Sequence, residues 1–132
     1  MGLDMYGYTM KAEFVGDRQT DVNVSEDERE EAALNHFAYW RKFNHLHGWM
    51  ENLYRQKGGK AEVFNCCTVR LELEDLDRLE SDLNEEKLEY TPGFFFGDDE
   101  IYPEDITETK TFIANARLAI AEGRAVFYDS WW

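Results

Sequence analysis

The sequence contains few of the features that mark secreted, membrane-spanning or nucleic-acid-binding proteins. Its two cysteines, Cys66 and Cys67, are neighbours, and adjacent cysteines rarely bridge because the disulfide geometry is strained. No disulfide framework is therefore expected, which fits a reducing cytoplasm. No apolar run approaches the roughly 20 residues that a transmembrane helix needs, and the basic and apolar blocks of a signal peptide are missing. The sequence predicts a cytoplasmic protein with no membrane partner.

Basic side chains are also scarce. The chain has 28 acidic residues against 14 basic ones, and its formal net charge is -14. Such a charge repels nucleic acid and anionic membranes, whereas it attracts basic partners and cations. We therefore expect no direct nucleic-acid binding, and we expect a partner protein to present a basic surface.

The common catalytic and metal-binding motifs are missing as well. The sequence has no phosphate-binding glycine loop, no metal-hydrolase signature and no serine elbow. His45 and His47 are two residues apart and would point in different directions on a helix, so they do not suit a zinc site. The acidic residues 98–105 do not match an EF-hand loop and suit the positive end of a helix. We predict no metal and no cofactor, and a non-enzymatic protein is favoured.

The remaining composition is that of one folded domain. The chain has 132 residues and 43% hydrophobic residues, enough for a single core, so residues 1–132 are predicted to form one domain. Strands are predicted at 5–15, 65–73 and 124–129. Helices are predicted from about 26, over 38–56, from about 75 and from 103. This order predicts an α+β fold, with a small three-stranded mixed or antiparallel sheet packed on one face against about four helices.

The predicted central helix, residues 38–56, contains a polar pair on its apolar side. Asn44 and His47 fall on the stripe that also contains Trp40, because residues three and four apart share a helix face. One interpretation is a hydrogen-bonding or acid–base pair at the mouth of an aromatic pocket. The other is structural, with His47 bonded to a backbone carbonyl in the core and Asn44 anchoring a neighbouring loop.

Two neighbouring features extend the functional interpretation. Arg41, with Lys42 and His45, would form a basic island where a small anionic ligand docks against the guanidinium group, although pairing with flanking carboxylates is the alternative. The candidate ligand-binding residues are Trp40, Arg41, Asn44 and His47. Cys66 would complete a Cys–His–Asn constellation with His47 and Asn44, so these three are weak catalytic candidates, but no oxyanion motif flanks Cys66.

The loop predicted over residues 90–101 contains three consecutive phenylalanines between glycines. Exposed rings at Phe94, Phe95 and Phe96 would mark a partner interface. Exposing so much apolar surface is unfavourable, so burial of at least two of the rings is the alternative.

Several blocks of the sequence resemble a known family. The blocks are MGLDMY at the start, YWRKFNHLHGW (residues 39–49), GFFFG (residues 93–97) and FYDSWW at the end. They are similar, in the same order, to a largely uncharacterised family of small phage and bacterial proteins. The family pattern YWRK-x-N-x-I-H-x-W falls on Tyr39, Trp40, Arg41, Lys42, Asn44, Leu46, His47 and Trp49, with Leu46 as a conservative departure. The resemblance implies a phage or prophage setting and assigns no activity to any residue.

Two hypotheses for function follow. The first is an acidic, phage-type accessory or counter-defence protein that binds a host protein or a small ligand without catalysing a reaction. The alternative is a small enzyme, or a binder of a nucleotide or other anionic ligand, whose site contains Asn44, His47 and Arg41. The second hypothesis requires a concave aromatic pocket in which these three side chains meet.

Overall fold

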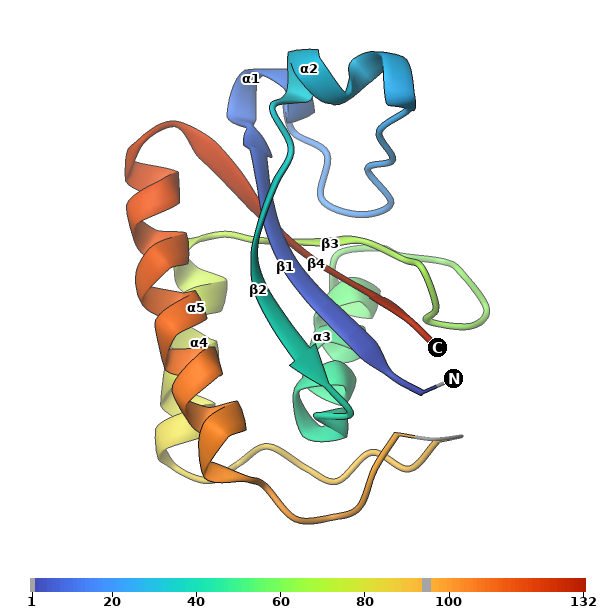
Figure 1. Ribbon diagram of the computed structural model, residues 1–132, viewed down its shortest axis with the longest axis vertical. Coiled ribbons are helices and arrows are strands. Elements are labelled where there is room, and N and C mark those ends of the chain that lie inside the picture. The colour runs from blue at the N-terminus through green and yellow to red at the C-terminus, as the bar shows by residue number, and fades with distance from the viewer. Residues whose placement is uncertain (1, 94–95) are drawn as a thin grey trace.

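A computed structural model describes residues 2–93 and 96–132. The fold is α+β, as predicted, with a four-stranded antiparallel sheet in the order β2-β1-β4-β3 (Figure 1). The strands are β1 (Asp4–Lys11), β2 (Asn35–Arg41), β3 (Val69–Leu71) and β4 (Arg124–Trp131). The helices are α1 (Ala12–Val15), the 3-10 turn η1 (Glu26–Glu28), α2 (Arg29–Ala32), α3 (Asn44–Gln56), α4 (Leu73–Asn84) and α5 (Pro103–Ala121). In the described part of the chain, none of these helices has the length and apolar character to cross a membrane.

The first and last strands of the chain, β1 and β4, are the two central strands of the sheet. β1 and β4 pair over eight residues, from Asp4 opposite Trp131 to Lys11 opposite Arg124. β2 pairs with the free side of β1, and the short strand β3 pairs with β4. The start of β1 and the end of β4 therefore lie side by side at one end of the sheet (Figure 1).

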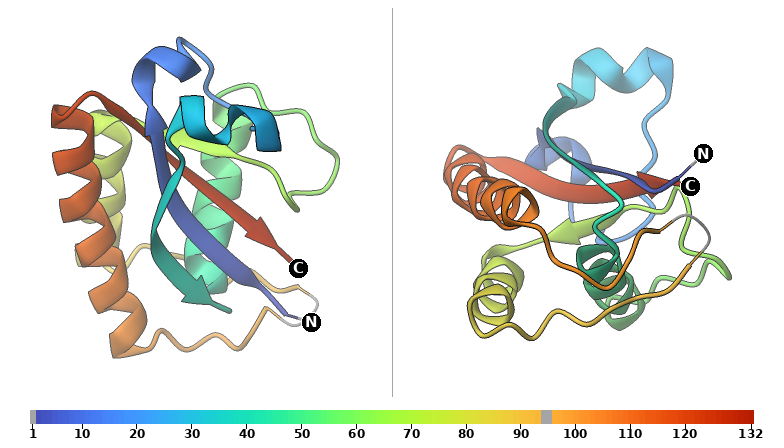
Figure 2. Two further views of the ribbon diagram at one scale, coloured as in Figure 1. Left: turned by 45° about the horizontal axis from the view of Figure 1, so that its top comes forward. Right: turned by 60° about the horizontal axis from the view of Figure 1, so that its bottom comes forward.

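Strand alternation divides the apolar side chains between two cores. Val126 and Tyr128 belong to the main core with α3, α4 and α5, whereas Ala125 and Phe127 belong to a smaller core on the opposite face. The long helices cover the first face, and α1 and α2 lie over one end of the second (Figure 2). We call the other end of this second face, which none of the described helices covers, the outer face. Its side chains come from Asp4, Tyr6, Tyr39, Arg41, Asp129 and Trp131.

The prediction of a helix over residues 38–56 is wrong at its start. Ala38 and Trp40 are buried while Tyr39 is 48% exposed, an alternation that belongs to a strand, and Trp40 lies opposite Met5 of β1. Lys42 has a positive φ of 57°, which separates β2 from α3. The prediction of three strands is therefore also wrong, because aromatic residues that suit a helix stripe suit a paired strand equally well.

The other boundaries differ less. The first strand ends at Lys11 and is followed by α1, and only Val69–Leu71 of the predicted second strand pairs with a neighbour. The Glu28 carboxylate accepts a hydrogen bond from the backbone N–H of Ser25, which is the reach-back bond of a capping box, and a second one from the Ser25 hydroxyl. The helix that follows ends at Ala32 instead of continuing to α3.

Candidate functional site

Asn44 lies at the start of α3 and is buried. Its amide nitrogen donates hydrogen bonds to the carbonyl oxygens of Phe96, at 3.2 Å, and Asp98, at 2.8 Å. Its amide oxygen accepts a hydrogen bond from the backbone N–H of Thr91, at 3.0 Å. The side chain thus connects both sides of the 91–98 segment to the helix, which is the loop-anchoring arrangement.

His47 lies one turn further along α3 and is 1% exposed. Its Nδ1 atom is 2.7 Å from the hydroxyl of Tyr128, and the rings of Phe64 and Phe96 lie 5.0 and 5.1 Å from its own. Burial in these surroundings lowers the pKa of His47 to about 4. The imidazole is therefore neutral at physiological pH and hydrogen-bonded within the core, to a tyrosine hydroxyl instead of a backbone carbonyl.

Trp40 and Arg41 extend from opposite faces of β2. The indole nitrogen of Trp40 donates to the hydroxyl of Thr109 at 3.0 Å inside the core. The Arg41 guanidinium is exposed on the outer face and forms an ion pair with Asp4 at 2.7 Å. The structure therefore does not bring Arg41 to the buried pair Asn44 and His47.

The remaining predicted residues are separated in the same way. Cys66 is exposed on a turn with φ of 59°, and desolvation together with the nearby Asp129 raises the pKa of its thiol, the opposite of what a nucleophile needs. Phe96 is buried, and its ring lies 5.0 Å from that of Trp132. Phe94 and Phe95 lie outside the described residues, so the interface predicted for them stays a prediction. In residues 2–93 and 96–132, no three His, Cys, Asp or Glu side chains are grouped to hold a metal.

Arg41 is the one residue of the outer face that also belongs to the predicted ligand-binding site. Tyr39 is 48% exposed and Trp131 is 62% exposed. The ring of Tyr6 lies 5.5 Å from that of Tyr39, so the aromatic side chains of β1 and β2 form a continuous patch. Figure 1 looks onto this end of the sheet, where the long helices lie behind or beside the strands. Large exposed rings on a rigid sheet are characteristic of binding surfaces.

The two carboxylates of the outer face are in different electrostatic states. Asp4 accepts hydrogen bonds from the Tyr39 hydroxyl at 2.5 Å and from Arg41 at 2.7 Å, and these bonds hold its pKa below the ordinary value. Asp129 lies directly across from Tyr6. Burial raises the pKa of Asp129 to about 6, and its side chain has no ion pair or hydrogen bond with any other described residue. Within residues 2–93 and 96–132, the outer face therefore contains a carboxylate without a cationic partner.

The sequence does contain a signal for this surface. In FYDSWW, Tyr128 and Ser130 are buried while Asp129 and Trp131 point to the outer face, and this is the alternation of a strand with one open side. The matching signal around Tyr39 is ambiguous, because the spacing of its aromatic neighbours suits a helix stripe as well as a paired strand.

Comparison of the chain with protein-family models, curated proteins and solved structures found no match. The resemblance to small phage and bacterial proteins therefore stays an expectation.

Proposed function

We propose that the protein is a non-enzymatic binding protein that engages a basic segment of a partner protein through the outer face. The observation that supports this proposal most directly is Asp129, a partly buried carboxylate without a cationic partner among the described residues. It shares its surface with the exposed rings of Tyr39 and Trp131. A partly desolvated anion beside aromatic rings is chemically complementary to a lysine or arginine side chain.

The recognition mode follows from the two kinds of group on the outer face. The cationic head of the partner's side chain pairs with the Asp129 carboxylate, and its stem or guanidinium plane packs on the rings of Tyr6 and Trp131. The net charge of -14 attracts a basic partner from a distance and accelerates its association. A phage accessory or counter-defence protein that captures a host protein would use such a surface, and the family resemblance supports that setting.

The geometry gives less support to an enzyme or anionic-ligand site at Asn44, His47 and Arg41. Asn44 and His47 are buried with their hydrogen bonds inside the protein, and Arg41 lies on the other side of β2 in an ion pair.

Fluorescence anisotropy with a labelled peptide of alternating arginine and glycine tests the proposal. Asp129→Asn removes one charge without changing the shape of the side chain, and we expect it to weaken binding about tenfold, as the loss of one charge-assisted contact of about 1.4 kcal/mol would. Glu122→Gln is the matched control, because it removes the same charge from an exposed position after α5. Equal weakening by both variants would show that only the overall charge matters and would overturn the proposal.

Two further measurements examine the aromatic part and the protonation of Asp129. Trp131→Ala should weaken binding at least fivefold, or about 1 kcal/mol, whereas Leu118→Ala, at a position that is 63% exposed on α5, should not. Acidification from pH 7 to pH 5 should weaken binding to the wild-type protein, because Asp129 is protonated near pH 6. This pH dependence should be absent in Asp129→Asn, and its persistence there would count against the role of Asp129.

A further inference from the structure

A polar groove lies on the opposite side of the sheet from the outer face. It runs between α3 and α4, has a volume of about 320 Å³ and is bordered by the segment after α4. A volume of this size suits a small molecule. Its polar side chains include His45, Asn52, Gln56, Arg78, Asp82 and Glu89.

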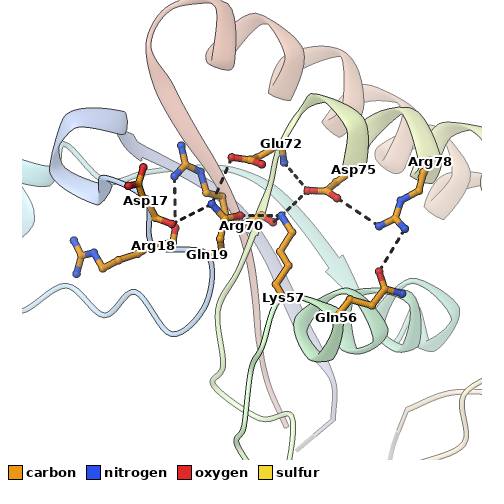
Figure 3. A network of polar contacts seen from close by, with 9 residues as sticks. All are labelled: Asp17, Arg18, Gln19, Gln56, Lys57, Arg70, Glu72, Asp75 and Arg78. Atoms are coloured by element: carbon orange, nitrogen blue, oxygen red, sulfur yellow. Dashed lines mark hydrogen bonds and ion pairs between the residues drawn. The ribbon is translucent and has the colours of Figure 1, made fainter.

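The cationic side of the groove is positioned by a buried ion pair. The ammonium of Lys57 lies 2.5 Å from the carboxylate of Asp75, and both side chains are largely buried. The second oxygen of Asp75 contacts the guanidinium of Arg78 at 3.4 Å, and Arg78 also donates to the side-chain oxygen of Gln56 at 3.4 Å (Figure 3). A guanidinium has five N–H groups, so Arg78 keeps donors for a ligand although its position is set by the protein.

The same groove contains carboxylates. Asp82 accepts a hydrogen bond from the indole nitrogen of Trp49 at 2.9 Å, which orients it. Glu89 is exposed, and its carboxylate contacts no other described side chain as an ion pair or hydrogen-bond partner. A positive group held by the protein, Arg78, and two carboxylates, of which Asp82 is held, therefore border one small groove.

His45 gives an independent indication that the groove lacks a hydrogen-bond donor. The residue is 3% exposed. Its Nε2 atom lies 3.0 Å from the carbonyl oxygen of Asp99, which can only accept, so Nε2 carries the proton and Nδ1 is an acceptor. Nδ1 is buried without a partner in the described part of the chain, an unfavourable state for a polar atom. The half-exposed ring of Tyr90, which also lines the groove, lies 6.1 Å from the imidazole.

The shape of the groove depends on one glycine. A Cβ atom on Gly48 would lie 2.0 Å from the hydroxyl of Thr91, so only glycine allows this segment to pack directly on α3. The backbone N–H of Thr91 is bonded to Asn44. The buried Asn44 thus holds one border of the groove in place.

We infer that this groove binds a small zwitterion with an ammonium and a carboxylate group, that is, a free amino acid. The ammonium supplies the donors that Glu89 and Nδ1 of His45 lack, and the carboxylate takes the remaining N–H groups of Arg78. The amide of Asn52, which has no hydrogen-bond partner among the described residues, is available for a polar side chain of the ligand. This inference does not depend on the proposed function of the outer face.

Titration of the isotopically labelled protein with L-glutamine, followed by backbone amide NMR shifts, tests the inference. We expect shifts confined to α3, α4 and residues 87–91, with a Kd of about 1 mM or tighter. Two probes each lack one charge: glutaramate has no ammonium, and 4-aminobutanamide has no carboxylate. Each should bind at least fivefold more weakly. Equal responses to all three probes, or no shifts at saturating concentration, would overturn the inference.

Variants connect the response to the groove. Arg78→Met keeps the aliphatic stem of a half-exposed side chain and should weaken the binding of L-glutamine while leaving the weak response to 4-aminobutanamide unchanged. Arg29→Met, which removes a guanidinium from exposed α2, is the control. Asp129→Asn should leave glutamine binding intact, so the two sites can fail separately. An equal loss of affinity for L-glutamine in Arg78→Met and Arg29→Met would contradict the inference.

Discussion

The burial of His47 has a direct consequence for the pH dependence of stability. The pKa of this side chain is about 4 in the folded protein and 6.5 in an unfolded chain. Between these values the unfolded chain binds a proton that the folded protein does not bind, so the free energy of unfolding falls as the pH falls from 6.5 to 4. The neutral imidazole therefore stabilises the fold fully above pH 6.5, and this contribution is lost on acidification.

The size of the effect follows from the same two values. The interval between 6.5 and about 4, at about 1.4 kcal/mol for each pH unit, amounts to about 3 kcal/mol. Asp105 and Asp129 act in the opposite direction, because burial raises both of their pKa values to about 6. The pH dependence of the wild-type protein contains all of these contributions, so His47 must be isolated by substitution.

His47→Gln is the informative variant, because glutamine does not titrate and retains a polar group for the Tyr128 hydroxyl. Urea unfolding at pH 7 and at pH 4 gives the free energy of unfolding for each protein. In wild type, the free energy of unfolding at pH 4 should be lowered relative to pH 7 by the His47 contribution. In His47→Gln we expect this decrease to be smaller by about 3 kcal/mol. The control is His36→Gln, since His36 is exposed on β2 and should contribute much less.

An NMR titration of the imidazole C–H signals provides a second measurement. The His47 signal should not move until the pH approaches 4. A midpoint near 6.5, or an unchanged pH dependence in His47→Gln, would refute the argument and would restore His47 as a candidate for proton transfer.

Three further predictions concern packing and buried polar groups, each measured by urea unfolding. Lys57→Met leaves the 7% exposed carboxylate of Asp75 without its closest cation and should destabilise the fold by about 3 kcal/mol or more; the double variant with Asp75→Leu should recover part of this loss. Gly7→Ala places a Cβ 2.6 Å from the ring of Phe112 and should cost about 1–3 kcal/mol, partly restored by Phe112→Leu. Asn44→Ala removes three hydrogen bonds, so we expect a loss of about 2–3 kcal/mol and faster proteolysis of the segment it anchors. For each single variant, a urea midpoint equal to that of the wild-type protein would contradict the reasoning behind it.

The parts of the fold that the sequence predicted well are those set by neighbouring residues. Pro103 begins α5 and Gly123 follows its end, as expected from the fixed φ of proline and the freedom of glycine at positive φ. The pairing of Ser25 with Glu28 is equally local. The α+β class follows from the order of such elements.

The candidate sites depended on contacts that no local pattern records. The residues 38–41 form a strand only because β1 is available to pair with them, and Tyr39 is 35 positions from its hydrogen-bond partner Asp4. The sequence allows both a functional and a structural interpretation of Asn44 and His47. Only the positions of Thr91 and Tyr128 show which groups these side chains bind.

The sequence by itself determined an acidic α+β protein and the start and end of α5, because charge, capping and proline or glycine geometry act within a few residues. Only the tertiary structure decided which aromatic residues face solvent, that Asp129 forms no ion pair with another described residue, and that α3 and α4 border a groove. Strand register and helix packing set these features, and both join segments that lie far apart along the chain.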